Sequence, residues 1–409
     1  MQQQQRKVIG LLSIPVIVAS LGYFVDIYDL LLFSIVRVKS LKDLGLTDAL
    51  VATDGMTIIG RQMLGLLIGG VLWGIMGDKK GRLSVLFGSI LLYSLANIAN
   101  GFVQNVTQYS WCRFVAGIGL AGELGAGITL VSELIPKEKR GIATSIVAGV
   151  GLSGAIVAYF IAQTFGWRTC YYIGGGLGLL LLALRISVFE SGMYQQMAES
   201  NIQKGNFFMF FTNGQRFKKY LLSILIGLPT WYVIGILISF SKEFGQQFGI
   251  KEEINPGKAV MYAYVAISIG DLLIGFVSQW LKSRKKALYI FYAITVVSII
   301  LYFRQYNGTA SGMYFLAALM GFGTGFWAIF VTMAAEHFGT NLRATAATTV
   351  PNIVRGSLPL MAMLFKYLQG SFSYINSAAI TGVVVMVISI ISVIMTEETF
   401  GKDLDFMEH

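Results

Sequence analysis

GGVLWGIMGDKKGRLSVL, residues 69–86, contains two apolar runs joined by a short turn with one acidic and three basic residues at 78–82. The stretch GDLLIGFVSQWLKSRKKAL, residues 270–288, repeats this arrangement about 200 residues further along the chain. In the second copy Gln279 replaces the acidic residue. The repetition predicts a chain built from two similar halves.

A second pair of segments has nearly the same offset. SELIPKEKRGIATSIVAGVG at 132–151 parallels AEHFGTNLRATAATTVPNIV at 335–354, and Glu and Arg stand seven residues apart in both. Two repeats with one offset indicate duplication. We therefore expect two bundles related by a pseudo-two-fold axis along the membrane normal, with a substrate path between them.

Apolar runs of the length needed to cross a membrane recur along the chain. A hydrocarbon core of about 30 Å requires roughly 20 apolar residues in a helix, because lipid satisfies no backbone polar groups. Twelve such runs predict an all-α integral membrane protein with a six-helix bundle at 1–189, a cytoplasmic linker at 190–217, a second six-helix bundle at 218–396 and a cytoplasmic tail at 397–409. The runs cover 8–36, 56–76, 83–104, 109–134, 140–164, 169–189, 218–240, 259–281, 286–304, 312–336, 343–368 and 374–396.

The composition agrees with a membrane protein and excludes several functions. Hydrophobic residues make up 55% and charged residues 13% of the 409 positions, too little polar surface for a soluble globule. The net charge of +10 comes from short alternate loops, so it indicates cytoplasmic termini in a bacterial inner membrane rather than a nucleic-acid partner. Arg37, Lys39 and Lys42, in the first periplasmic loop, are an exception. With two His, two Cys and no nucleophile or nucleotide motif, we expect no enzyme, no metal and no cofactor.

The turn after the second run carries a motif of a known family. Gly74, Asp78, Gly81 and Arg82 match the pattern G-x3-D-x2-G-R, which is similar to the signature of the major facilitator superfamily. Residues 113–141 and the ending EETFGKDLDFME at 397–408 resemble its sugar porters and metabolite:proton symporters. The resemblance implies alternating access, with a cytoplasmic gate formed by Gly74, Asp78, Gly81, Arg82, Glu133, Arg140, Glu336 and Arg343.

Few charged residues lie within the apolar runs, and those few are candidates for function because a buried charge is unfavourable unless paired. GYFVDIYDLLLF places Asp26 and Asp29 three residues apart, nearly on one helix face. The resemblance points to Asp29 as the proton carrier and to Arg113 as its neighbour. Asp26 is either a second coupling group or a solvated residue near the periplasmic end. Glu123 is either a coupling group or the structural partner of Arg113.

Arg355 is the main candidate for substrate binding. It lies between two prolines in VPNIVRGSLPL, where a kinked helix opens space, and its guanidinium can hold a carboxylate by two parallel hydrogen bonds. The alternative is a structural pair with Asp271. The aromatic candidates for lining the path are Tyr23, Tyr28, Trp231, Tyr232, Tyr262, Tyr264, Phe326 and Trp327. Trp231 and Trp327 are the first choices, followed by Tyr28 and Tyr262.

These features predict a proton-coupled symporter that imports a small organic anion, with the lipid bilayer, protons and a small-molecule substrate as its partners and a monomer as sufficient unit. The alternatives are sugar or polyol import and transport of a larger carboxylate such as a siderophore. The seventh run, LLSILIGLPTWYVIGILISF, contains no Asn or Gln, which counts against a typical sugar porter.

Overall fold

The computed structural model describes residues 14–80, 82–123, 140–190, 207–402 and 407. The described residues form helices and connecting turns, with no strand among them. Each of the twelve predicted runs overlaps a helix, which confirms the all-α membrane fold. Part of the predicted linker and part of the tail lie outside the described residues, so the domain boundaries stay a prediction.

In the first half the helices are mostly continuous. The first helix runs past its predicted end, and the second begins earlier than predicted, so that only a short turn separates them. Eight helical segments of the described chain are long and apolar enough to cross a membrane, and shorter apolar helices accompany them. The helices of this half are α1 Ile14–Asp43, α2 Asp48–Lys80, α3 Arg82–Asn100, α4 Val106–Leu120, α6 Arg140–Thr164 and α7 Trp167–Glu190.

In the second half three predicted spans are interrupted. The seventh passes from α-helix to π-helix just after Pro229, the tenth breaks before Trp327, and the eleventh breaks at Ser357 ahead of Pro359. The elements are η1 Phe207–Phe211, α9 Gly214–Tyr232, η2 Val233–Ile238, α10 Ser241–Gln247, α11 Pro256–Leu281, α12 Arg284–Phe303, α13 Ala310–Gly323, α14 Trp327–Glu336, α15 Thr340–Gly356, α16 Leu358–Leu368 and α17 Tyr374–Met395.

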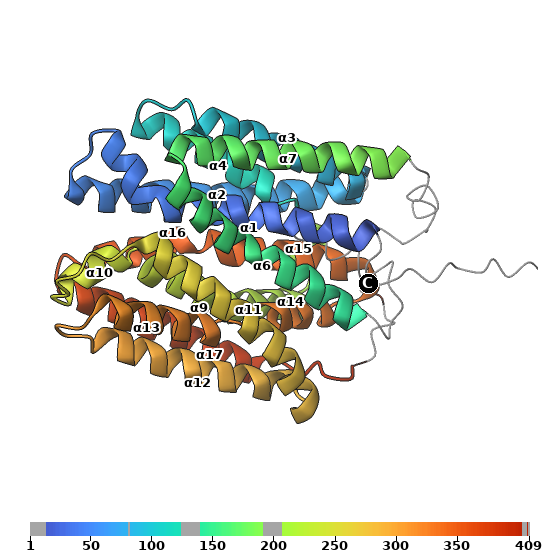
Figure 1. Cartoon of the computed structure of the whole chain (residues 1–409). Helices are drawn as coiled ribbons and strands as arrows, with labels where there is room; N and C mark the ends of the chain where they lie inside the picture. Colours follow the sequence, from blue (N-terminus) through green and yellow to red (C-terminus); the bar gives the residue numbers. More distant parts are fainter. Residues whose placement is uncertain (1–13, 81, 124–139, 191–206, 403–406, 408–409) are drawn as a thin grey trace, which may run out of the picture.

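Helices of the same half lie together, and the two halves meet along the middle of the molecule (Figure 1). Within the first half α1 packs on α6 and α7, and α2 packs on α4. Between the halves α2 packs on α15 and α16, while α11 packs on α1 and α6. The interface therefore involves α1, α2 and α6 from one half and α11, α15 and α16 from the other.

Glycines allow the close approach of α2 and α4. A Cβ atom on Gly65 would lie 2.2 Å from the carbonyl oxygen of Phe114, and one on Gly117 would lie 2.2 Å from that of Gln62. Both distances are impossible for real atoms, so each helix needs glycine where the other crosses it.

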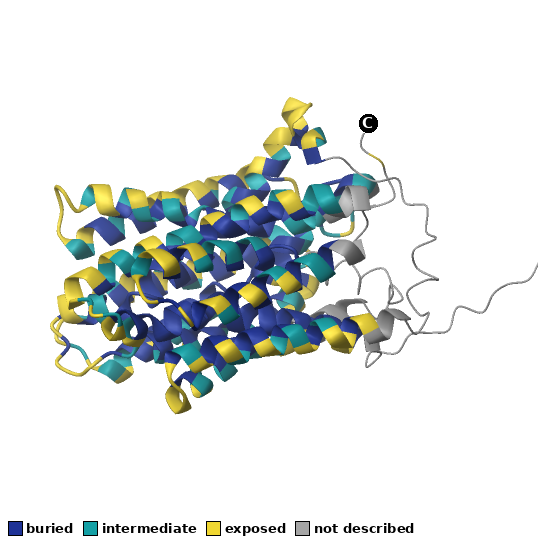
Figure 2. Cartoon of the chain, turned by 90° about the horizontal axis from the view of Figure 1, so that it is seen from above, coloured by how far each residue is buried: buried dark blue, intermediate teal, exposed yellow. Residues whose placement is uncertain are grey.

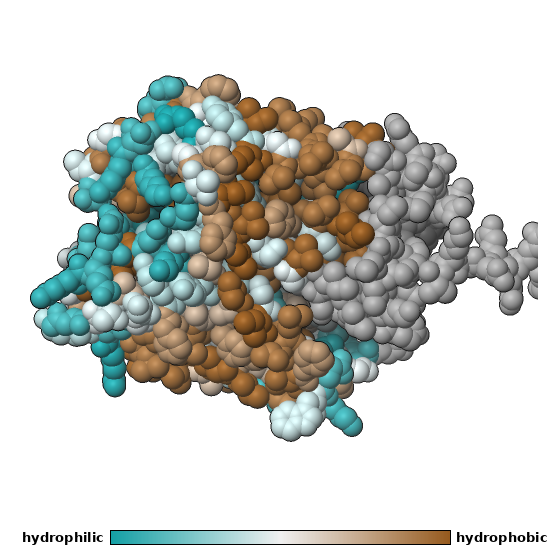
Figure 3. Space-filling view, in the orientation of Figure 1, coloured by the Kyte–Doolittle hydropathy of each residue, from teal (hydrophilic) through white to brown (hydrophobic). Residues whose placement is uncertain are grey.

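The outer surface is apolar and the buried residues line the inside. Figure 2 shows buried residues along the middle of the bundle and exposed ones around it. In Figure 3 a hydrophobic surface covers the middle of the molecule, and hydrophilic residues gather at the end where α1 meets α2. Trp280 and Tyr306, 82% and 81% exposed, flank the two ends of α12. Such aromatic side chains are typical of the two membrane interfaces.

Candidate functional site

A buried pair of opposite charges joins the two halves at the centre of the interface. Asp26 of α1 and Arg355 of α15 are 0% and 1% exposed, and the closest oxygen and nitrogen atoms, Asp26 Oδ2 and Arg355 Nη1, lie 3.9 Å apart. Within the described part of the chain, neither Asp26 oxygen has a hydrogen-bond partner, and neither do Nε and Nη1 of Arg355. Buried polar groups are nearly always hydrogen-bonded, so these four atoms are available to bond to water or to a bound molecule.

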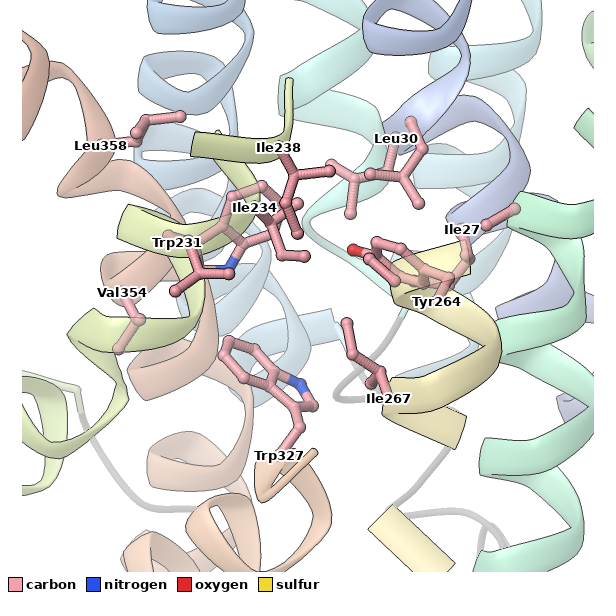
Figure 4. Close-up of a cluster of buried hydrophobic side chains, with 14 of the residues drawn as sticks. Ile27, Leu30, Trp231, Ile234, Ile238, Tyr264, Ile267, Trp327, Val354 and Leu358 are labelled. Atoms are coloured by element: carbon pink, nitrogen blue, oxygen red, sulfur yellow. The ribbon is translucent and has the colours of Figure 1, made fainter. Parts of the chain in front are cut away.

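Aromatic side chains surround the pair. Trp327, the first residue of α14, lies with its ring 5.8 Å from the Arg355 guanidinium carbon. Figure 4 shows Trp231, Trp327 and Tyr264 pointing toward one central space together with isoleucines of α1, η2 and α11. The indole N–H groups of both tryptophans are buried and lack an acceptor among the described residues. The site thus offers apolar walls, one cation and free hydrogen-bond donors.

Two predicted tyrosines lie elsewhere. The Tyr28 hydroxyl donates to the carbonyl oxygen of Cys170 at 2.9 Å, which fixes the ring inside the first half. Tyr262 is 40% exposed and stacks on Tyr314 at the outside of α11. The tyrosine of α11 that reaches the site is Tyr264, because two residues along a helix turn the side chain to another face. Tyr264 lies seven residues before Asp271, so the two side chains share one face of the helix, and this spacing indicates that Tyr264 faces the interior.

Asp29 and Arg113 are brought together as the resemblance implies. Arg113 Nη1 donates to Asp29 Oδ1 at 2.9 Å and to the Asn97 side chain at 2.9 Å, and both charged residues are fully buried. Nε of Arg113 donates to the Gln62 side chain at 3.3 Å. The network therefore ties α1, α2, α3 and α4 together within the first half.

Glu123 has a different partner from the predicted one. Arg185 of α7 donates from both terminal nitrogens to the two Glu123 oxygens, so Glu123 does not pair with Arg113. The two side chains fill the space beside Gly22 of α1, where a Cβ atom would collide with both. No spacing rule links residues 62 positions apart, so this ion pair was not predictable from local sequence.

Asp271 also has a structural contact and is not the partner of Arg355. Its side chain accepts from the backbone N–H of Ala328 at 3.1 Å, in the first turn of α14. A carboxylate at this position satisfies a free amide where the tenth span breaks and restarts. Asp271 thereby helps to fix Trp327 at the start of the new helix.

A buried ion pair closes one end of the interface, and sequence reasoning missed it. Arg37, expected in a periplasmic loop, lies inside α1 and is fully buried. Its two terminal nitrogens donate to the two oxygens of Glu243 of α10 at 2.7 and 2.8 Å, and it also donates to the carbonyl oxygen of Ser239. Residues 26, 29 and 37 share one face of a helix, and this spacing could have placed Arg37 on the buried face of α1.

Only part of the predicted cytoplasmic gate can be located. Gly74 lies in α2 with Thr349 of α15 3.4 Å from its Cβ position. Glu336 pairs with Arg284 at 3.2 Å and accepts from Thr399, so the start of α12, the end of α14 and the tail meet. Arg343 lies in α15. Gly81 and Glu133 lie outside the described residues, as do the side chains of Asp78, Arg82 and Arg140.

His337 lies at the same end and is buried. Burial lowers the pKa of His337 to about 4, because the charged imidazolium loses its hydration and has cationic lysines nearby. The Ser223 hydroxyl lies 3.4 Å from its Nδ1 atom. His337 is therefore neutral at physiological pH. Across the described residues, no three His, Cys, Asp or Glu side chains gather so as to hold a metal ion.

The chain is similar in sequence and in fold to several known proteins. The sequence model of the Major Facilitator Superfamily matches residues 19–363. The chain is 26% identical to the niacin transporter NiaP of Acinetobacter baylyi, over 95% of this chain and 94% of that protein. It is 25% identical to the gentisate transporter of Corynebacterium glutamicum, over 78% and 73%. The solved structure of the proton:xylose symporter XylE, bound to 6-bromo-6-deoxy-D-glucose, superposes with a TM-score of 0.69 at 19% identity, over 96% of this chain and 97% of that one.

Proposed function

Because the chain belongs to the major facilitator superfamily, we propose that this multi-pass transporter imports a small organic carboxylate together with protons, by alternating access across the bacterial inner membrane. It is a transporter and not an enzyme. The proposal includes cytoplasmic termini and function as a monomer, since one path between two bundles needs no second chain.

The observation that carries the substrate class is the incompletely bonded guanidinium of Arg355. A buried arginine whose Nε and Nη1 donors have no partner among the described residues can bind a carboxylate through charge-assisted hydrogen bonds. The apolar and aromatic walls suit the rest of a small organic acid. The relatives that transport niacin and gentisate carry acids of this kind, which supports the assignment.

Proton coupling is assigned to the buried carboxylates of α1. Asp29 is held by Arg113, which also bonds to Gln62 and Asn97, so a proton on Asp29 would weaken a network that joins four helices. We assign this pair to the step in which the two bundles rock. A proton that enters with an anion also offsets its repulsion by an inside-negative potential, about 2.3 kcal/mol per charge per 100 mV.

Sugar or polyol import is the second candidate, because the fold is similar to that of a proton:xylose symporter. Binding of several sugar hydroxyls requires free amide side chains. Gln62 is bonded through both amide atoms, to Arg113 and to a main-chain carbonyl oxygen. Asn97 Nδ2, Asn352 Oδ1 and the amide of Asn100 have no partner among the described residues, but the buried cation of Arg355 matches a carboxylate and not a neutral sugar. The carboxylate therefore remains the better-supported substrate.

The test is substrate-driven acidification of proteoliposomes that contain a pH-sensitive dye. We expect niacin, gentisate or another small carboxylate to acidify the lumen, and we expect xylose to have no effect. Arg355→Lys should lose the response, and so should Asp29→Asn. The matched control is Arg61→Lys, since Arg61 lies over the exposed Trp111 ring, away from the site. Acidification by xylose, or full activity of Arg355→Lys, would contradict the proposal.

A further inference from the structure

Asp26 differs from the other buried carboxylates near it. Asp29 accepts from Arg113, Glu123 is held by Arg185, and Asp271 accepts from the backbone of Ala328. Asp26 has only the Arg355 charge, at 3.9 Å, and no hydrogen bond among the described residues. The titratable and charged groups that interact with the Asp26–Arg355 pair are Tyr23 and Asp29 of α1, Tyr93 of α3, Glu123 and Tyr264 of α11. Asp271 interacts with Tyr23 and Tyr264 rather than with the pair itself.

The charge balance of the site changes when a substrate carboxylate enters. The empty site contains one negative and one positive charge. An added carboxylate would leave one uncompensated negative charge in a buried, apolar space, which is strongly unfavourable. No second cation faces Asp26 from the described elements packed around it, because Arg113 and Arg185 are already bonded to other carboxylates. Neutrality returns if one carboxylate takes up a proton.

We infer that Asp26 and the substrate carboxylate compete for Arg355, so that each carboxylate bound there leaves one proton on Asp26. The inference deepens the proposed function and rests on it. A hydronium ion of the solvent on the open side gives up the proton, so one O–H bond breaks there, one forms on Asp26, and a water molecule is left. Coupling at this site is therefore a direct consequence of binding, separate from the role of Asp29 in rocking.

The geometry fits such an exchange. A distance of 3.9 Å is too long for a hydrogen bond, so Arg355 can leave Asp26 without breaking one. The free Nε and Nη1 atoms then bind the substrate, and the new hydroxyl group of Asp26 can donate to it. Since Asp26 and Arg355 belong to opposite halves, the exchange also replaces a direct attraction between the bundles by one that passes through the substrate.

The experiment measures equilibrium binding in detergent, by quenching of tryptophan fluorescence with niacin and gentisate as probes, since two tryptophans lie in the site. Binding is recorded from about pH 6 to about pH 9, where these carboxylates are ionised. In the wild type the dissociation constant should rise toward tenfold per pH unit at the alkaline end. In Asp26→Asn the dissociation constant should be independent of pH, because an amide resembles the protonated acid.

Three variants test whether the effect belongs to Asp26. Asp26→Glu and Asp29→Asn should keep the pH dependence of binding, as should Asp48→Asn, a control at an exposed aspartate of α2. A pH-dependent Asp26→Asn, or a wild type that binds gentisate equally at both ends of the range, would overturn the inference and leave the proposed function standing. If neither carboxylate quenches the fluorescence and xylose does, the proposed function fails and the inference with it.

Discussion

The contact between Arg37 and Glu243 should hold the two halves together at the end predicted to face the periplasm. The test is Glu243→Gln, which removes the negative charge and keeps the shape of the side chain. Arg37 is fully buried, and its partner side chain is 14% exposed. The guanidinium also lies 4.2 Å over the Phe240 ring.

The magnitude follows from the geometry. At 2.7 Å and an effective dielectric constant of about 20, the Coulomb attraction is roughly 6 kcal/mol, and removal of one partner of a buried pair typically costs about 3–5 kcal/mol. Glu243 is partly exposed and glutamine still accepts a hydrogen bond, so we expect about 2–3 kcal/mol. Because 1.4 kcal/mol corresponds to a factor of ten, the population open at this end should rise about 30- to 150-fold.

The assay is the rate at which a membrane-impermeant maleimide labels Ser34→Cys, with Cys112 and Cys170 replaced by alanine. Ser34 is buried and accepts a hydrogen bond from Ser239 across the interface, so it reacts only when this end opens. Glu243→Gln should increase the labelling rate about 30- to 150-fold. The exchanged pair, Arg37→Glu with Glu243→Arg, should bring the labelling rate part of the way back to that of the wild type.

The matched control removes a second ion pair at the same end. Asp48 of α2 bonds to Lys242 of α10 at 3.3 Å, but its side chain is 64% exposed. Exposed pairs contribute about 0–1 kcal/mol, so Asp48→Asn should change the labelling rate only about threefold. If Glu243→Gln labels at the wild-type rate, the reasoning about the buried pair is wrong.

Three further predictions concern binding, pH and packing. Trp327→Phe should weaken gentisate binding about three- to tenfold through loss of one hydrogen bond, measured by calorimetry, whereas an unchanged affinity would exclude the indole N–H as a donor. The His337 pKa of about 4 lies below its unfolded value near 6.5, so the protonated form favours unfolding. As the pH drops from 6.5 toward 4 the free energy of unfolding should decrease by up to about 3 kcal/mol, measured as a lower melting temperature, and the His337→Gln variant should lack this component. Gly65→Ala should lower the melting temperature by several degrees, and Gly176→Ala, with nothing within 4 Å of its Cβ position, should not; equal effects would refute the packing argument.

The fold was predictable because its signals are local. The length of an apolar run and the repeat of a turn motif depend only on neighbouring residues, and lipid leaves the helix as the one structure that satisfies the backbone. Helix ends were less predictable. The polar residues of 37–43 look like a loop, yet α1 continues through them because Arg37 finds Glu243, a contact 206 residues away.

The candidate site was predictable as a set of residues but not as a set of pairs. Charges within apolar runs identified Asp26, Asp29, Arg113 and Arg355. Burial of a charged side chain in a membrane span is unfavourable, so such residues are candidates for function. Partner choice depends on how helices rotate against one another. Glu123 meets Arg185 of α7 rather than Arg113, and on α11 Tyr264 rather than Tyr262 faces inward.

The pair of exposed aromatics at the ends of α12 has a consequence for the choice of lipid. With 20 residues, α12 is about 30 Å long, close to the thickness of an ordinary hydrocarbon core. The exposed Trp280, in the last turn of α11, and the exposed Tyr306 lie close in the chain to the two ends of α12. Its neighbour α11 has 26 residues and a length of about 39 Å, so it projects or tilts. A bilayer with shorter or longer acyl chains would match one of these two packed helices only by mismatching the other. Transport rates measured in lipids of graded chain length should therefore pass through an optimum.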